Sequence, residues 1–174
     1  MIVPYVNLAA QHAPIKDELL AAVGSVIDHG HFILGGEVTE FEERFAEQCQ
    51  VNYAIGLNSG TDALILALKT LGIGPGDEVI TPPNSFVAST SCITLLGASP
   101  VFVDVAEEYN IDPSLIEQAI TPRTRAIIPV HLTGRPADMD SIMDIARRHG
   151  LHVVSEWLHR VGQPERRSRE SQRG

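Results

Sequence analysis

The sequence is poor in lysine, cysteine and aromatic residues. Its 174 residues include only two lysines, two cysteines and 5% aromatic side chains. Cys49 and Cys92 lack the paired spacing of a zinc site, so we expect both to be buried thiols in a reducing cytoplasm. No uninterrupted apolar run approaches the length of a membrane span, and the first ten residues carry no positive charge, as a secretory signal would. The sequence therefore predicts a cytoplasmic protein without a membrane segment.

Basic residues are also scarce. Thirteen Lys and Arg stand against 22 Asp and Glu, which gives a formal net charge of −9. A general nucleic-acid binder needs a basic face that displaces counterions, so that class is not expected. No Gly-x-Gly-x-x-Gly and no Gly-Lys-Thr/Ser occurs, which disfavours the nucleotide folds based on those motifs. The hydrophobic fraction of 44% is typical of one globular domain with a sizeable core.

Apolar periodicity up to Val154 predicts alternating strands and helices. The expected strands are 51–57, 78–81, 100–105, 125–130 and 151–154, and the expected helices are 13–28, 38–49, 61–71, 85–96, 113–120 and 138–149. This order is typical of right-handed crossovers. We therefore expect an α/β fold with a mostly parallel sheet and helices on both faces.

The composition changes near Ser155. Residues 155–174 carry five Arg and three Glu, and residues 163–174 contain no aliphatic or aromatic side chain. A segment of this kind has too little apolar surface to form a core. We therefore divide the chain into a folded domain, residues 1–154, and a divergent tail, residues 155–174, which is expected to be disordered.

Ligands in open α/β folds bind at the carboxyl ends of the strands, and three segments leave strands there. In 58–64, Gly60 permits a tight turn and Thr61 starts a helix, so their amides and the Thr61 hydroxyl could bind a phosphate. A plain helix N-cap is the alternative. In 81–89, Phe86 is interpreted either as a stacking wall for a flat ring or as a core aromatic.

The third segment covers residues 129–140. His131 ends a buried strand, and it is interpreted either as a pocket residue or as a core histidine satisfied by backbone bonds. Asp138 is expected to be a helix N-cap rather than a catalyst, because Asp is preferred at that position. These two side chains are therefore secondary candidates.

The three segments, in this order and spacing, resemble the DegT/DnrJ/StrS family of pyridoxal-phosphate-dependent sugar aminotransferases. Residues 4–8 (PYVNL), 35–42 (GGEVTEFE) and 74–80 (GPGDEVI) carry the same resemblance, which covers about residues 3–154. The resemblance implies part of the large domain of the aspartate-aminotransferase-like class, known as fold type I. It further implies pyridoxal 5'-phosphate as cofactor, a keto sugar nucleotide and glutamate or glutamine as substrates, and a homodimer with active sites at its interface.

The resemblance also assigns the site residues. Gly60 and Thr61 match the residues that cradle the cofactor phosphate, and Phe86 matches the aromatic that stacks on the ring. The family's Asp at the pyridine nitrogen and its Gln beside the ring fall on Glu156 and His159, which both depart from the pattern. Because Glu is longer than Asp by one methylene, the same bond to the ring nitrogen would require a shift of the backbone.

The family's Schiff-base lysine has no counterpart, so no catalytic residue is assigned. Neither Lys16 nor Lys69 lies in the later Ser-x-x-x-x-Lys segment that carries it. Family members are about twice this long, in line with two domains. We expect a truncated relative that is inactive alone, with an out-of-frame tail after Val154 or, alternatively, a natural new tail. The other functions considered are a non-catalytic fragment that binds a phosphate ligand or a partner subunit, and an unrelated Rossmann-like binding domain.

Overall fold

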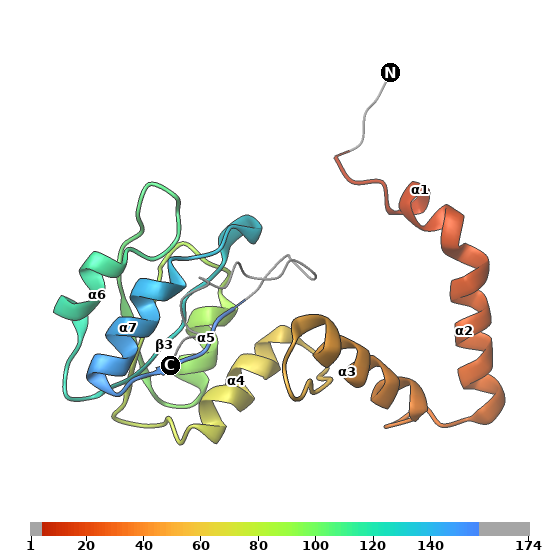
Figure 1. The fold of residues 1–174 in the computed structure, drawn as a ribbon. Helices are drawn as coiled ribbons and strands as arrows, with labels where there is room; N and C mark the ends of the chain where they lie inside the picture. The colour runs from red at the N-terminus through yellow and green to blue at the C-terminus, as the bar shows by residue number, and fades with distance from the viewer. Residues whose placement is uncertain (1–4, 157–174) are drawn as a thin grey trace, which may run out of the picture. The chain divides into compact units, whose positions relative to one another are not determined.

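The computed structural model describes residues 5–156, and the chain divides into two compact units, Met1–Gly56 and Leu57–Gly174. The first unit is helical. It contains α1 (Leu8–His12), the short 3-10 helix η1 (Ala13–Ile15), α2 (Lys16–His29) and α3 (Gly36–Cys49) (Figure 1). Gly30 ends α2 in the left-handed conformation, with φ of 71°, which glycine adopts without a steric cost.

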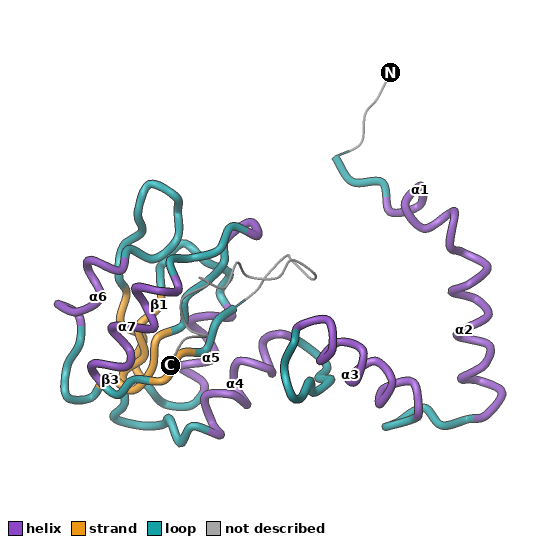
Figure 2. Tube along the Cα trace, in the orientation of Figure 1, coloured by secondary structure: helices purple, strands orange, loops and turns teal. Residues whose placement is uncertain are grey.

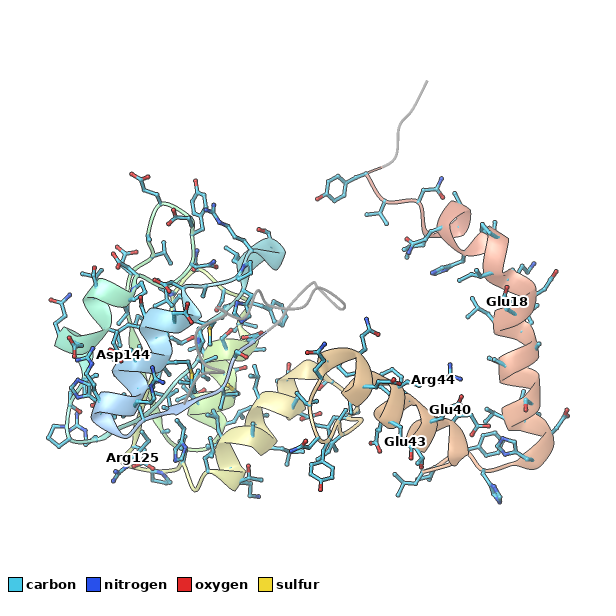
Figure 3. The ribbon with its side chains drawn as sticks, in the orientation of Figure 1. Glu18, Glu40, Glu43, Arg44, Arg125 and Asp144 are labelled. Atoms are coloured by element: carbon cyan, nitrogen blue, oxygen red, sulfur yellow. The ribbon has the colours of Figure 1, made fainter. Side chains whose placement is uncertain are left out.

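The first unit buries little apolar surface. Among its described residues only Ala46 of α3 is buried. Charged side chains lie along α3. Glu40 and Arg44, one turn apart on this helix, form an ion pair of 2.5 Å (Figure 3). Four apolar side chains of α2 remain 47–61% exposed: Leu19, Leu20, Val23 and Ile27. Within the first unit, no residue of α2 is buried.

A four-stranded parallel sheet forms the centre of the second unit. Its strands are β1 (Glu78–Thr81), β2 (Ser99–Phe102), β3 (Thr124–Ile127) and β4 (His152–Val153), in the spatial order β2-β1-β3-β4. The main helices of this unit are α4 (Gly60–Thr70), α5 (Ala88–Leu95), α6 (Pro113–Ala119) and α7 (Met139–His149). Figure 2 shows the strands in orange, with helices on either side.

Alternate strand residues supply two separate cores, because successive side chains of a strand point to opposite faces. Val79 packs with buried residues of α4 and α5, whereas its neighbour Ile80 packs with buried residues of α6 and α7. The first core includes Leu64, Leu68, Val79, Cys92, Ile93, Ala126 and Ile128. The second includes Ile80, Val103, Ile116, Ile127, Ile142 and Ile145. Both faces of the sheet are thus covered, as a parallel sheet requires.

The predicted fold class is confirmed, but several elements differ from their predicted bounds. The strand predicted at 51–57 is wrong: the segment is irregular, because it pairs with no other strand among residues 5–156. The helix predicted at 85–96 begins only at Ala88, since the two prolines after β1 are followed by a turn. The strands predicted at 100–105, 125–130 and 151–154 are shorter, at 99–102, 124–127 and 152–153.

The two cysteines have different environments. Cys92 is buried, as predicted, but Cys49 is exposed, so the prediction of two buried thiols is wrong for Cys49. Cys49 is the last residue of α3, a helix that buries only Ala46. The predicted tail lies almost wholly outside the described residues, and its boundary at Val154 stays a prediction.

Candidate functional site

The first turn of α4 presents unpaired backbone donors. Ser59 caps the helix: its Oγ accepts the Asp62 amide N–H at 3.1 Å and donates to the Asp62 carboxylate at 2.9 Å. Within residues 5–156 the Gly60 and Thr61 amides have no hydrogen-bond partner, as expected for the first positions of a helix. Two such N–H groups at the positive end of a helix dipole favour an anion. The helix has its N-cap at Ser59, and a phosphate at Gly60 and Thr61 stays a prediction.

Phe86 lies in the turn between β1 and α5. Its side chain is 58% exposed, so the interpretation as a core aromatic is wrong. The turn is held from within: the Phe86 carbonyl accepts the Ser89 amide N–H at 3.1 Å, and Ser85 Oγ donates to Ser89 Oγ at 2.9 Å. The aromatic ring therefore projects from a fixed turn at the carboxyl end of β1. Stacking of the ring on a ligand stays a prediction.

Glu156 is fixed by its backbone beside the end of β3. Its amide N–H donates to the Pro129 carbonyl at 2.9 Å, and its carbonyl accepts the His131 amide N–H at 3.0 Å, in a parallel bridge with Val130. The residue is only 8% exposed, and its Oε2 accepts the Ser89 hydroxyl at 2.5 Å. Burial raises the pKa of Glu156 above its usual range, and the Ser89 hydrogen bond opposes this by stabilising the charged form.

Two further buried groups adjoin Glu156. Cys92 lies one turn after Ser89 on α5, and its pKa is raised to about 11, first by burial and then by the charge of Glu156. His131 is fully buried, and burial lowers its pKa. Its Nδ1 accepts the Ala137 amide N–H at 3.0 Å, which supports the core-histidine interpretation and leaves the proton of the neutral ring on Nε2.

The remaining candidates lie away from this cluster or outside the described residues. Asp138 caps α7 and accepts the Ser141 amide at 3.2 Å, which confirms the N-cap prediction. Lys16 begins α2, and Lys69 lies in the last turn of α4; both are exposed. His159 lies outside the described residues.

Sequence reasoning gave Ser89 no role, although the residue belongs to the segment that carries Phe86. The available signal was its position on α5, among the buried positions Ala88, Cys92 and Ile93. A hydroxyl buried on an apolar face requires a hydrogen-bond partner. Besides its local partners Ser85 and Phe86, this hydroxyl binds Glu156, which is 67 residues away in the sequence.

The described part of the chain shows neither a metal site nor a membrane span. Among residues 5–156, no three His, Cys, Asp or Glu side chains are grouped so that they could hold a metal ion. None of the helices in that range is long and apolar enough to cross a membrane.

The sequence is similar to sugar aminotransferases. It is 50% identical over 155 residues to dTDP-3-amino-3,4,6-trideoxy-alpha-D-glucose transaminase of Streptomyces venezuelae, covering 88% of this chain and 41% of that protein. It is 47% identical over 162 residues to UDP-2-acetamido-2-deoxy-3-oxo-D-glucuronate aminotransferase of Pseudomonas aeruginosa, covering 92% of this chain and 45% of that protein. The chain thus spans less than half the length of these relatives.

Solved structures agree in fold. DesV of Streptomyces venezuelae superposes with a TM-score of 0.86 at 50% identity, covering 88% of this chain and 42% of DesV. NtdA of Bacillus subtilis, solved with its cofactor PMP (pyridoxamine phosphate), gives a TM-score of 0.85 at 37% identity, covering 88% of this chain and 36% of NtdA. These neighbours confirm the predicted relation to the fold type I large domain. The sequence matches one family over residues 13–166, and the chain belongs to that family, the DegT/DnrJ/EryC1/StrS aminotransferases.

Proposed function

We propose that this chain is part of a pyridoxal-phosphate-dependent aminotransferase that acts on a keto sugar nucleotide. The family and the named activities of its sugar-transaminase relatives support the reaction class. The observation that carries the proposal in this structure is the buried carboxyl of Glu156. It lies beside the first turn of α5 at the carboxyl ends of parallel strands, where α/β folds bind ligands.

The residues present fit the cofactor in their chemistry. Gly60 and Thr61 offer two unpaired amide donors to a phosphate. Phe86 offers an exposed aromatic face to a planar ring. Glu156, when ionised, can accept a hydrogen bond from a protonated ring nitrogen. His159 is proposed to support the ring on the resemblance alone.

Bound pyridoxal phosphate would supply an electron-withdrawing ring that stabilises negative charge on the amino-bearing carbon. The chain's own groups hold and tune that ring. The Gly60 and Thr61 amides bind the phosphate, and Phe86 covers one ring face and excludes water from it. The Glu156 carboxylate keeps a proton at the ring nitrogen, because a negative charge nearby favours the protonated form.

The amino donor is proposed to be glutamate or glutamine, as the family resemblance implies. We further propose that the 174-residue chain does not transaminate by itself. Lys16 begins α2 and Lys69 lies in the last turn of α4, and neither matches the lysine that the family uses. Binding without stabilisation of the transition state gives no rate.

Two glycine-to-proline substitutions, each at the first residue of a helix, test the phosphate site. Gly60 is the first residue of α4 and follows Ser59 in an extended conformation, so Gly60→Pro removes one amide donor at a position where proline is well tolerated. Losing a hydrogen bond to a charged group costs about 1.5–3 kcal/mol, so the Kd for pyridoxal phosphate should rise roughly 10- to 100-fold.

Gly36→Pro is the matched control. Gly36 is the first residue of α3, follows Gly35 in an extended conformation, and has open space where a Cβ would lie. This variant should bind the cofactor as the unchanged chain does. Absorbance titration with pyridoxal phosphate measures both Kd values. Equal affinity of Gly60→Pro and Gly36→Pro would remove the phosphate site from the proposal.

The exposed apolar residues of α2 favour subunit binding as a second function. Leu20, Val23 and Ile27 are each at least 57% exposed, and water contact at such residues is unfavourable. We propose that α2 contributes to a homodimer, as the family resemblance implies. Light scattering should then give about twice the chain mass of 18.9 kDa, and Leu20→Lys should shift the mass toward one chain. A single-chain mass for both proteins would contradict this.

A further inference from the structure

The hydroxyl of Ser89 is the middle member of a series of hydrogen bonds that runs from Ser85 to the buried carboxyl of Glu156. Ser85 Oγ donates to Ser89 Oγ at 2.9 Å, and Ser89 Oγ donates to Glu156 Oε2 at 2.5 Å. Ser89 is fully buried. Within residues 5–156 the other carboxyl oxygen of Glu156, Oε1, accepts no hydrogen bond. The chain of hydroxyls therefore occupies one oxygen of the carboxyl and leaves the second available.

The same hydroxyl also contacts the turn that carries Phe86. Ser89 Oγ lies 3.1 Å from the Phe86 carbonyl, in hydrogen-bond geometry. A serine hydroxyl has one proton but accepts as well as donates. When Glu156 is ionised, Ser89 donates to the carboxylate. When Glu156 is protonated, the carboxyl can donate to Ser89, and Ser89 can donate to the Phe86 carbonyl. Ser89 is thus satisfied in both protonation states.

We propose that Ser89 is a positioning residue that ties the turn of Phe86 to the carboxyl of Glu156 and turns Oε1 of that carboxyl toward the ring nitrogen of bound pyridoxal phosphate. The link between the three residues stands on their contacts alone, whereas its last step rests on the proposed function. The backbone of Glu156 is also fixed, because its amide N–H donates to the Pro129 carbonyl and its carbonyl accepts the His131 amide N–H.

The surroundings of the carboxyl make this donor important. Two further titratable residues adjoin Glu156: Cys92 on the facing helix α5, whose thiol is affected by the Glu156 charge, and His131, whose backbone amide binds the Glu156 carbonyl. Burial, followed by the charge of Glu156, raises the pKa of Cys92 to about 11, and burial lowers the pKa of His131, so both side chains are neutral near pH 7. Within residues 5–156 no cation pairs with Glu156, and Ser89 is the one side chain that stabilises its charged form.

Carboxyl titration of the unliganded 174-residue chain tests the link directly. The ¹³C NMR signal of Glu156 is assigned by its loss in Glu156→Gln and followed against pH. Ser89→Ala removes the donor, so the titration midpoint of Glu156 should move to higher pH. Ser89→Thr keeps a hydroxyl and should restore the midpoint. Ser91→Ala is the matched control, because Ser91 lies on the same helix and its hydroxyl contacts only the Ala88 carbonyl among the described residues.

Cofactor binding separates this proposal from the proposed function. With pyridoxal phosphate, Ser89→Ala should weaken binding near neutral pH and recover affinity at higher pH, where Glu156 ionises again. Gly60→Pro should weaken binding at every pH. If neither the wild-type chain nor any variant binds the cofactor, the proposed function fails. The pH titration of Glu156 in the unliganded chain still tests the role of Ser89.

One result overturns the positioning role. An unchanged Glu156 midpoint in Ser89→Ala, with a cooperative melt like that of Ser91→Ala, would show that the hydroxyl does not hold the carboxyl. If Ser89→Ala does not fold, Ser89→Gly takes its place, because glycine likewise has no side-chain hydrogen-bond donor. An unchanged midpoint in that variant would have the same meaning.

Discussion

The Glu78 carboxylate at the start of β1 binds the Arg123 guanidinium just before β3. Arg123 donates to Glu78 Oε1 through Nε at 3.0 Å and through Nη2, and the Thr121 hydroxyl donates to Oε2 at 2.5 Å. The Glu78 side chain is only 7% exposed, so these donors replace the water that burial removes. The cluster joins the amino ends of two neighbouring strands, at the end of the sheet opposite the candidate site.

This cluster should make stability depend on pH in the acid range. Hydrogen bonds from Thr121 and Arg123 hold the pKa of Glu78 below its usual value of 4.5, so the folded chain binds this proton less readily than the unfolded chain. The stabilisation is complete above pH 4.5 and is lost as the pH falls through the lowered pKa. Glu78→Gln should lower the free energy of unfolding at neutral pH and flatten its acid dependence, as measured by urea unfolding at several pH values.

Glu107→Gln is the control for that experiment. Glu107 is exposed and forms no ion pair within residues 5–156. This variant removes the same charge without removing a bond, so its unfolding curve should follow that of the unchanged chain. Equal acid dependence in Glu78→Gln and Glu107→Gln would contradict the assignment.

The two cores should unfold together. Leu68 of α4 and Ile142 of α7 are fully buried on opposite faces of the sheet. Leu68→Ala and Ile142→Ala should each cost about 2–5 kcal/mol, because each leaves a cavity in a packed core. Leu95→Ala on α5 is the control, since that side chain is 68% exposed and its removal should change stability by less than about 0.5 kcal/mol. Two separate thermal transitions in either core variant would show that the faces are not one cooperative unit.

The sequence predicted the parts of the fold that depend on local pattern. Asp138 caps its helix as expected, because capping needs only a short side chain within three residues of its target. The alternation of Val79 and Ile80 between two cores follows from β1 being buried on both faces. The predicted strand at 51–57 failed, because a strand exists only where a neighbouring strand pairs with it.

In the candidate site, too, the local features could be predicted from the sequence and the long-range contacts could not. Gly60 and Thr61 could be predicted to start a helix, because the turn and the helix are adjacent in the sequence. The hydrogen bond between Ser89 and Glu156 could not be predicted, because it joins residues 67 positions apart and depends on how α5 packs on the sheet. Local pattern identified the segments of the site, and tertiary packing determined which side chains meet.

The thiol of Cys92 should report on the charge of Glu156. Burial is the larger cause of its raised pKa of about 11, and the Glu156 carboxylate is the second cause. Glu156→Gln removes that negative charge, so the Cys92 pKa should fall while staying above its ordinary value of 9.0. Ultraviolet absorbance of the thiolate, followed against pH, measures the change in a Cys49→Ser background. Glu117→Gln, on the exposed side of α6, is the control and should leave the titration midpoint of Cys92 unchanged. If Glu156→Gln also leaves this midpoint unchanged, the electrostatic coupling between Cys92 and Glu156 is contradicted.

The 174-residue chain should show no transamination, even where it binds the cofactor. Transamination needs a lysine that holds the cofactor and moves a proton, and proton transfer by a positioned side chain contributes about 10²–10⁴-fold in rate. Lys16 and Lys69 are exposed at the start of α2 and in the last turn of α4. Borohydride reduction of the cofactor-loaded chain, followed by mass spectrometry, should therefore find no stoichiometric label on either lysine, and Lys69→Arg should bind cofactor as the unchanged chain does. Full labelling of Lys16 or Lys69, together with glutamate-dependent conversion of the cofactor to its amine form, would refute the prediction.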